Sequence, residues 1–166
     1  MRIDVLNGVN LSLLGRRDQA IYGDQSIQDL ETQVYAWARD LDLQVRCRQT
    51  NHEGEYVGFL HQALGTADGL IVNPGAWTHY SWAIHDALEP FEVPFVEVHL
   101  SNVDEREEWR RHSVLTGLGG MRIVGKGFES LQRESLYMGC VSMSAAHFPG
   151  GAIKRAGFAA AELAAH

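Results

Sequence analysis

The chain has 166 residues, a formal net charge of −7 and 45% apolar residues, which is typical of one globular domain with a hydrophobic core. The acidic balance disfavours binding to a nucleic-acid backbone, and no apolar run approaches the roughly 20 residues that span a bilayer. Two cysteines are too few for a disulfide framework, and a strand beginning at the first residues leaves no room for a signal peptide, so we expect a cytoplasmic location.

Short apolar segments alternate with helical segments along residues 1–137. Strands are predicted at 3–6, 45–49, 69–72, 95–98 and 121–124. Helices are predicted to start at Ser26, after a capping-box pattern at 50–53, at Thr78 or Ser81, over the charged run 105–111, and over 128–137. This alternation predicts an α/β fold, a three-layer doubly wound sandwich with a five-stranded parallel sheet. Residues 138–166 are predicted to be a C-terminal extension of uncertain structure.

Unusual polar residues follow several of the predicted strands. The groups are Asn7 with Asn10, Asn51 with His52, Asn73 with Gly75, and Glu97 with His99 and Ser101. In an open parallel sheet, the carboxyl ends of the strands form the edge where ligands bind. The one-sided grouping therefore predicts a functional site at this edge.

A proton-transfer pair is the chemistry that these residues suggest. His99 ordinarily titrates near neutrality and can act as acid or base. Glu97 precedes it by two residues on the same strand, so both side chains leave the same face, and the carboxylate can orient the imidazole. Alternatively, Glu97 forms a salt bridge with an arginine. Backbone N–H groups near Ser101 and Asn102, at a predicted helix start, suit an anionic substrate carboxylate.

The long loop at 11–25 is a second candidate region, because loops of this length are often functional. Tyr22 lies there close to Arg16 and Arg17. A phenol has a pKa near 10, so a tyrosine base must have its pKa lowered by roughly 2 to 3 units, which adjacent guanidinium charge favours. The alternative is an aromatic side chain packed on the core.

Several common sites are not indicated by the sequence. No Gly-x-Gly-x-x-Gly or P-loop pattern follows the first strand, and no Gly-x-Ser-x-Gly elbow is present. The histidines lack metal-site spacing, so we expect no metal. Lys126 and Lys154 are the only lysines, which limits Schiff-base chemistry.

The chain resembles the type II 3-dehydroquinate dehydratases of the shikimate pathway and of quinate catabolism. The motifs occur in family order and spacing between residue 3 and about residue 125. They are Leu6-Asn7-Gly8-Val9-Asn10-Leu11, Leu14-Gly15-Arg16-Arg17, Ile21-Tyr22-Gly23, Gln49-Thr50-Asn51-His52-Glu53-Gly54, Asn73-Pro74-Gly75-Ala76-Trp77-Thr78-His79, Glu97-Val98-His99-Leu100-Ser101-Asn102 and Arg106-Glu107-Glu108-Trp109-Arg110-Arg111-His112-Ser113.

The resemblance implies a flavodoxin-like fold, usually assembled as a dodecamer of trimers, with no cofactor or metal. It implies a hydro-lyase that converts 3-dehydroquinate to 3-dehydroshikimate by trans-elimination of water through an enolate. In the implied mechanism, Tyr22 is the base, Arg17 lowers its pKa, Asn10 holds a water at the enolate oxygen, and His99, oriented by Glu97, is the acid. The resemblance also implies that Asn73, His79 and Arg110 bind substrate hydroxyls, and that Leu100 and Ser101 bind the carboxylate. It implies that Asp86 reaches a neighbouring subunit's site and that Arg106 assists loop closure.

The sequence departs from the family pattern at several positions. Val9 replaces a proline, which is expected to loosen the turn that carries Asn10, and Gln19 also replaces a proline. Bulkier residues or changes near the expected subunit interface are Trp77, Tyr80, Trp82 and His85. They leave open a second reading, a paralogue acting on a related β-hydroxy ketone acid. A third reading is a flavodoxin-like binding module without catalysis.

Overall fold

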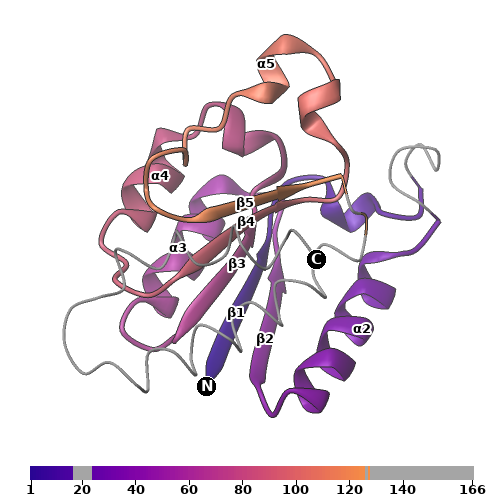
Figure 1. Ribbon diagram of the computed structural model, residues 1–166, viewed down its shortest axis with the longest axis vertical. Helices are drawn as coiled ribbons and strands as arrows, with labels where there is room; N and C mark the ends of the chain where they lie inside the picture. The colour runs from indigo at the N-terminus through magenta and orange to yellow at the C-terminus, as the bar shows by residue number, and fades with distance from the viewer. Residues whose placement is uncertain (17–23, 126, 128–166) are drawn as a thin grey trace, which may run out of the picture.

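A five-stranded sheet with helices on both faces forms the centre of the molecule (Figure 1). The computed structural model describes residues 1–16, 24–125 and 127. All strand pairs are parallel, in the order β2-β1-β3-β4-β5. The order 2-1-3-4-5 is that of flavodoxin-like doubly wound sheets. The predicted α/β flavodoxin-like sandwich with five parallel strands is therefore confirmed.

The five strands fall where the apolar runs predict them, and no strand end differs from its predicted position by more than one residue. Their bounds are β1 Arg2–Asn7, β2 Gln44–Gln49, β3 Gly69–Asn73, β4 Phe95–His99 and β5 Met121–Val124. The helices are η1 Leu11–Leu13, α2 Ile27–Asp40, α3 Glu53–Ala63, η2 Gly75–His79, α4 Trp82–Leu88, η3 Val103–Glu105 and α5 Glu108–Arg111.

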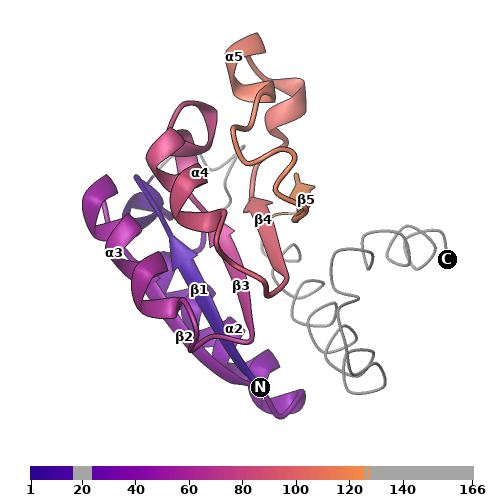
Figure 2. The ribbon, with the colours of Figure 1, turned by 90° about the vertical axis from the view of Figure 1, so that its left-hand side faces the viewer.

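Two apolar layers hold the sandwich together (Figures 1 and 2). Between the sheet and α3 with α4, residues such as Tyr56, Leu60 and Ile84 pack on alternate strand residues. On the opposite face, α2 contributes Leu30 and Val34, among others, to the second layer. The alternation follows from the pleat, because successive side chains on a strand point to opposite faces of the sheet.

Local sequence was sufficient to predict the N-cap of α2 but not that of α3. Ser26 caps α2 with a capping box, its hydroxyl accepting from the N–H of Asp29 while the Asp29 carboxylate accepts from the N–H of Ser26. The predicted capping box at 50–53 is wrong. Because α3 begins at Glu53 with His52 as its N-cap, Thr50 lies too early to cap it, and its hydroxyl bonds to Glu55 instead.

The prediction that the third helix starts at Thr78 or Ser81 is confirmed for Ser81, and the prediction of one helix over 105–111 is wrong. The third helix begins at Trp82 with Ser81 as its N-cap, whereas Thr78 lies in the preceding 3-10 turn η2. The charged run at 105–111 is not one helix. It is divided between η3 and α5 by extended backbone at Arg106 and Glu107. The predicted helix at 128–137 and the extension at 138–166 lie outside the described residues.

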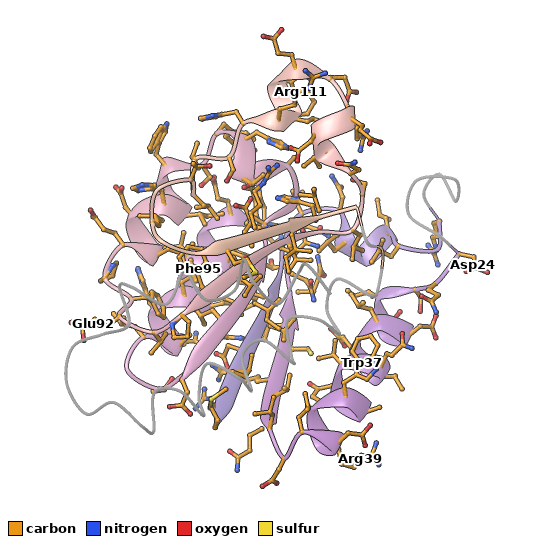
Figure 3. The ribbon with its side chains drawn as sticks, in the orientation of Figure 1. Asp24, Trp37, Arg39, Glu92, Phe95 and Arg111 are labelled. Carbon is orange, nitrogen blue, oxygen red and sulfur yellow. The ribbon has the colours of Figure 1, made fainter. Side chains whose placement is uncertain are left out.

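The carboxyl ends of all five strands point to the same edge of the sheet, because the strands are parallel. Figure 1 shows α5 standing beyond this edge, and in Figure 3 Arg111 marks α5 while Phe95 marks the opposite end of β4. Within the described ranges, no helix has the length and apolar character needed to span a membrane.

Candidate active site

A cavity of about 100 Å³ lies at the edge that the polar residues predict. The residues around it come from the turns after β1 and β3, the end of β4 and the η3–α5 segment. They are Val9, Asn10, Leu11, Asn73, Gly75, Ala76, His79, His99, Leu100, Ser101, Val103, Arg106 and Arg110. Eight of the side chains singled out from sequence thus meet around one cavity, although they are spread over a hundred residues.

The predicted site residues outside this lining fall into three classes. Glu97 lies behind His99 and is buried. Asp86 is on α4 with 79% of its side chain exposed, and it does not line the cavity. Tyr22 and Arg17 lie outside the described residues.

His99 and Glu97 form a buried pair at the end of β4. His99 Nε2 lies 2.7 Å from Glu97 Oε1, and both residues are at most 5% exposed. The expected same-face arrangement of the two side chains is therefore present, and Glu97 makes this contact rather than a salt bridge with an arginine. Since Nε2 is engaged by the carboxylate, Nδ1 is the ring nitrogen left to serve a ligand.

Glu97 remains a carboxylate in this environment. Burial raises its pKa, but hydrogen bonds from His99, Thr78 and Ser113 outweigh that effect and bring the pKa below the ordinary glutamate value. An ionised carboxylate at Nε2 accepts that ring N–H and so fixes the orientation of the imidazole. The pair therefore has the arrangement of a general acid with its orienting group.

His79, the second histidine that lines the cavity, differs from His99 in its hydrogen-bond partner. His79 stacks on His99 with ring centroids 6.3 Å apart, and its Nδ1 lies 2.7 Å from the backbone oxygen of His112. Partial burial lowers the pKa of His79. A neutral ring whose Nδ1–H donates to a carbonyl leaves Nε2 as an acceptor, which suits a hydroxyl group of a ligand.

Arg110 supplies positive charge from α5. Its Nε lies 2.9 Å from Glu107 Oε2, and its guanidinium lies 4.0 Å from the centre of the Trp109 ring. Trp109 also meets His79 edge to face at 5.2 Å. One half-exposed tryptophan therefore contacts two cavity residues at the rim of the site.

The turns after β1 and β3 pack tightly against each other. A Cβ on Gly8 would collide with the Pro74 oxygen, and one on Gly75, where φ is +66°, would lie 2.7 Å from the Val9 oxygen. Asn73 is buried between them, and its side-chain oxygen accepts from the Gly75 N–H at 3.3 Å. Larger residues at these glycines would push the turns apart.

Asn10 projects from the first of these turns in a left-handed conformation, with φ 67°. Its backbone N–H donates to Asn51 Oδ1 at 2.9 Å, and Gln49 Nε2 donates to the Gly8 oxygen at 3.2 Å. The turn carries Val9 where the family has proline, and side chains from the end of β2 hold it in place.

The aromatic departures lie away from the cavity. Trp77 is buried in the core against Tyr56, with ring centroids 5.5 Å apart, so it is not a surface residue as its place in the expected interface suggested. Tyr80 and Trp82 are 59% and 60% exposed. None of the three is among the described residues that line the cavity.

Sequence reasoning missed two buried hydroxyls, Thr78 and Ser113, which both bond to Glu97. Thr78 directly precedes His79, and Ser113 directly follows His112. These positions were the only local signal of a role at the site. No group of three or more metal-ligating side chains occurs among the residues that the structure describes.

Comparison with known proteins shows which family the chain resembles. Residues 1–136 match the family model "Dehydroquinase class II". Curated relatives named 3-dehydroquinate dehydratase include one from Pelobacter propionicus, 49% identical over 130 residues that cover 78% of this chain and 87% of the relative. Another, from Thermotoga petrophila, is 50% identical over 127 residues that cover 76% and 87%.

A solved structure gives the same result at the level of the fold. The type II dehydroquinase from Propionibacterium acnes superposes with a TM-score of 0.81 at 39% identity, covering 84% of this chain and 96% of that one. The family model covers most of the chain, and the sequence and structural similarities agree with it. The chain belongs to the class II dehydroquinase family.

Proposed function

We propose that this protein dehydrates 3-dehydroquinate to 3-dehydroshikimate by trans-elimination of water. The observation that carries the proposal is the cavity in which His99, backed by ionised Glu97, faces the same space as Asn73, His79 and Arg110. The relatives named 3-dehydroquinate dehydratase supply the substrate.

The reaction divides into two proton transfers. Tyr22, as a phenolate favoured by the charge of Arg17, takes the C2 proton, and the electrons of that bond form an enolate stabilised by a water held on Asn10. The enolate then collapses, the C1–oxygen bond breaks, and His99 gives its Nδ1 proton to the departing hydroxyl, which leaves as water. The product is a conjugated enone, and Tyr22 and His99 return to their starting states through solvent.

Binding groups orient the substrate for these steps. Asn73, His79 and Arg110 contact its hydroxyls, and the N–H and hydroxyl groups at Leu100 and Ser101 hold its carboxylate. Arg106 lies in the cavity wall and assists closure over the substrate. None of these groups requires a metal or cofactor, so we expect full activity after dialysis against EDTA.

Enone absorbance after addition of 3-dehydroquinate tests the proposal. We expect turnover by the wild-type protein and a loss of about 10³-fold or more in Tyr22→Phe, since the general base is removed. Tyr35→Phe is the matched control, because this phenol lies on α2, accepts from the Cys47 N–H of β2 at 3.2 Å, and is not among the described residues that line the cavity. Folded wild-type protein that yields no product at micromolar concentration contradicts the proposal.

We further propose a dodecamer of trimers in which Asp86 enters the site of a neighbouring subunit. Its exposed carboxylate on α4, beside the exposed Trp82, supports a role outside its own cavity. Mixing Asp86→Ala with Tyr22→Phe subunits tests this. Activity recovered in mixed oligomers supports a contribution between subunits, and no recovery contradicts it.

The paralogue reading depended on Trp77, Tyr80 and Trp82. Since none of them lines the described cavity, the structure offers no support for a changed substrate.

A further inference from the structure

Two buried hydroxyl groups converge on the carboxylate that orients His99. Thr78 Oγ1 donates to Glu97 Oε1, and Ser113 Oγ donates to Glu97 Oε2 at 2.9 Å. Thr78 is 1% exposed and Ser113 is 3% exposed, so water does not compete for these bonds. The Ser113 oxygen also accepts from the Leu115 N–H at 3.1 Å, which leaves its own proton for Glu97.

The two hydroxyls come from different segments of the site. Thr78 precedes His79 in η2, and Ser113 follows the α5 segment that carries Arg110. The Val114 N–H donates to the Thr78 backbone oxygen at 2.8 Å, which ties these segments together directly beside the carboxylate. Glu97 is thus the point at which β4, η2 and the end of α5 meet.

The chemistry of the pair depends on which partner carries the proton. With Glu97 ionised, His99 can be an imidazolium whose Nδ1 proton is acidic enough to transfer to a departing hydroxyl. With Glu97 protonated, its hydroxyl donates to Nε2 and His99 is a neutral ring, which is a far weaker acid. Neutral donors on Glu97 favour the first state because they stabilise the charged carboxylate without competing for the proton.

Other ionisable groups around Glu97 do not replace these donors. From η2, His79 faces His99 and bonds through Nδ1 to the His112 oxygen. From α3, the buried Tyr56 gives its hydroxyl proton to the Leu6 oxygen. Arg122 lies opposite Glu97 in the β5 register, but its Nη1 donates to Asp104 Oδ1 at 3.0 Å.

We propose that Thr78 and Ser113 are positioning residues for the general acid: their hydroxyls hold Glu97 ionised and in place, so that His99 presents a transferable proton at Nδ1. The inference rests on the proposed function, since it assigns a task in that reaction. It predicts an effect on the chemical step more than on substrate binding.

Steady-state kinetics of Thr78→Val and Ser113→Ala provide the first test. In each variant we expect kcat to fall by about tenfold or more, because a hydrogen bond to a charged group is lost, while KM changes by less than about threefold. Thr78→Ser keeps the hydroxyl and is expected to recover kcat to within about threefold of wild type. Ser113→Ala removes a single oxygen and keeps the test decisive should Thr78→Val not fold.

Thr50→Val is the matched control. It also removes a buried threonine hydroxyl bonded to a glutamate, here Glu55, but it lies outside the cavity lining. We expect its kcat to stay within about twofold of wild type, because the loss does not touch Glu97.

The carboxyl ¹³C signal of Glu97 provides a readout that a purely structural role would not move. In protein labelled at glutamate carboxyls, this signal is assigned by its absence from Glu97→Gln. We expect its titration midpoint to rise in Thr78→Val and in Ser113→Ala, and to stay unchanged in Thr50→Val.

The outcomes separate the two proposals. An inactive, folded wild type overturns the proposed function and this inference with it. An active wild type whose hydroxyl variants keep kcat, or lose only KM, overturns this inference alone. Reduced kcat with an unmoved Glu97 titration also overturns it, since the hydroxyls would then act by packing.

Discussion

Two buried carboxylates on the same face of the sheet are neutralised in opposite ways. Asp4, on β1, is fully buried and is surrounded by three arginines, with Arg48 Nη2 at 3.0 Å, Arg46 Nε at 3.3 Å and Arg2 Nε at 3.5 Å. Glu97, on β4, has two hydroxyls and a histidine.

The difference lies in whether the partner can release a proton. A guanidinium is always charged in proteins, so the Asp4 cluster is a fixed ion-pair network that joins β1 to the edge strand β2. An imidazole titrates near neutrality, and hydroxyls stay neutral, so the Glu97 cluster holds a charge while leaving a proton free to move. We infer that the first cluster serves stability and the second serves chemistry.

Glu97→Gln is expected to show the largest loss of activity among the variants that test this distinction. The amide cannot stabilise the imidazolium of His99, so kcat is expected to fall by about 10²- to 10³-fold. Steady-state assays at neutral pH, with circular dichroism to confirm folding, measure it. A kcat within threefold of wild type contradicts the assignment of Glu97 as the orienting group.

Asp4→Asn is expected to lower the stability of the protein and to leave its activity unchanged. Removing the carboxylate leaves three arginines without their shared counter-charge, which costs about 3 kcal/mol in the free energy of unfolding, less than a fully dry pair because Arg46 is partly exposed. Urea denaturation measures this loss, with the exposed Asp40→Asn as control.

The kcat of folded Asp4→Asn should match that of wild type. A large loss of kcat at unchanged stability would show that the two clusters do not divide the tasks as inferred.

The free energy of unfolding at acidic pH provides a test of the ionisation state of Glu97. The pKa of Glu97 is lowered in the folded protein, below the ordinary value of 4.5, so the unfolded chain binds the proton first as the pH falls. The stability that Glu97 contributes is therefore complete above about pH 5 and is lost as the pH falls through the folded pKa.

The difference in unfolding free energy between wild type and Glu97→Gln, measured from pH 7 to pH 3, should be constant at first and then shift against the wild type below about pH 4.5. A difference that is flat across the whole range would mean that Glu97 is not stabilised as a carboxylate.

A smaller effect is expected at the open side of the cavity, where Asn51 holds the exposed Asn10 turn. Asn51→Ala removes the neutral hydrogen bond that Asn51 Oδ1 accepts from the Asn10 N–H, together with the exposed side-chain bonds to Gln49 and Ser12. The bond to Asn10 is worth about 1 kcal/mol, so kcat is expected to fall by about fivefold. Steady-state kinetics measure this change. A loss as large as that of Glu97→Gln would show that a neutral, exposed contact matters as much as the buried charged pair.

Features encoded within a few residues were predictable. The capping box of Ser26 and Asp29 involves neighbours in sequence, and the apolar run that contains Val96 and Val98 marks β4 without reference to the rest of the fold. The failed capping box at 50–53 is instructive, because Thr50 had a competing partner, Glu55, only one turn further on.

Local sequence was enough to predict the parallel α/β fold and the grouping of polar residues at strand ends. It also predicted that His99 and Glu97 share a face, because period-two alternation places residues two apart on one side of a strand. It also carried the family motifs.

Only the tertiary structure brings hydroxyl donors to Glu97, the carboxylate that contacts the proposed acid His99. Thr78 and Ser113 are 35 positions apart in the chain, and their hydroxyl oxygens lie 3.0 Å apart only because η2 and the end of α5 pack over β4. No local pattern reports such a contact, since it depends on the joint packing of three segments around one buried charge.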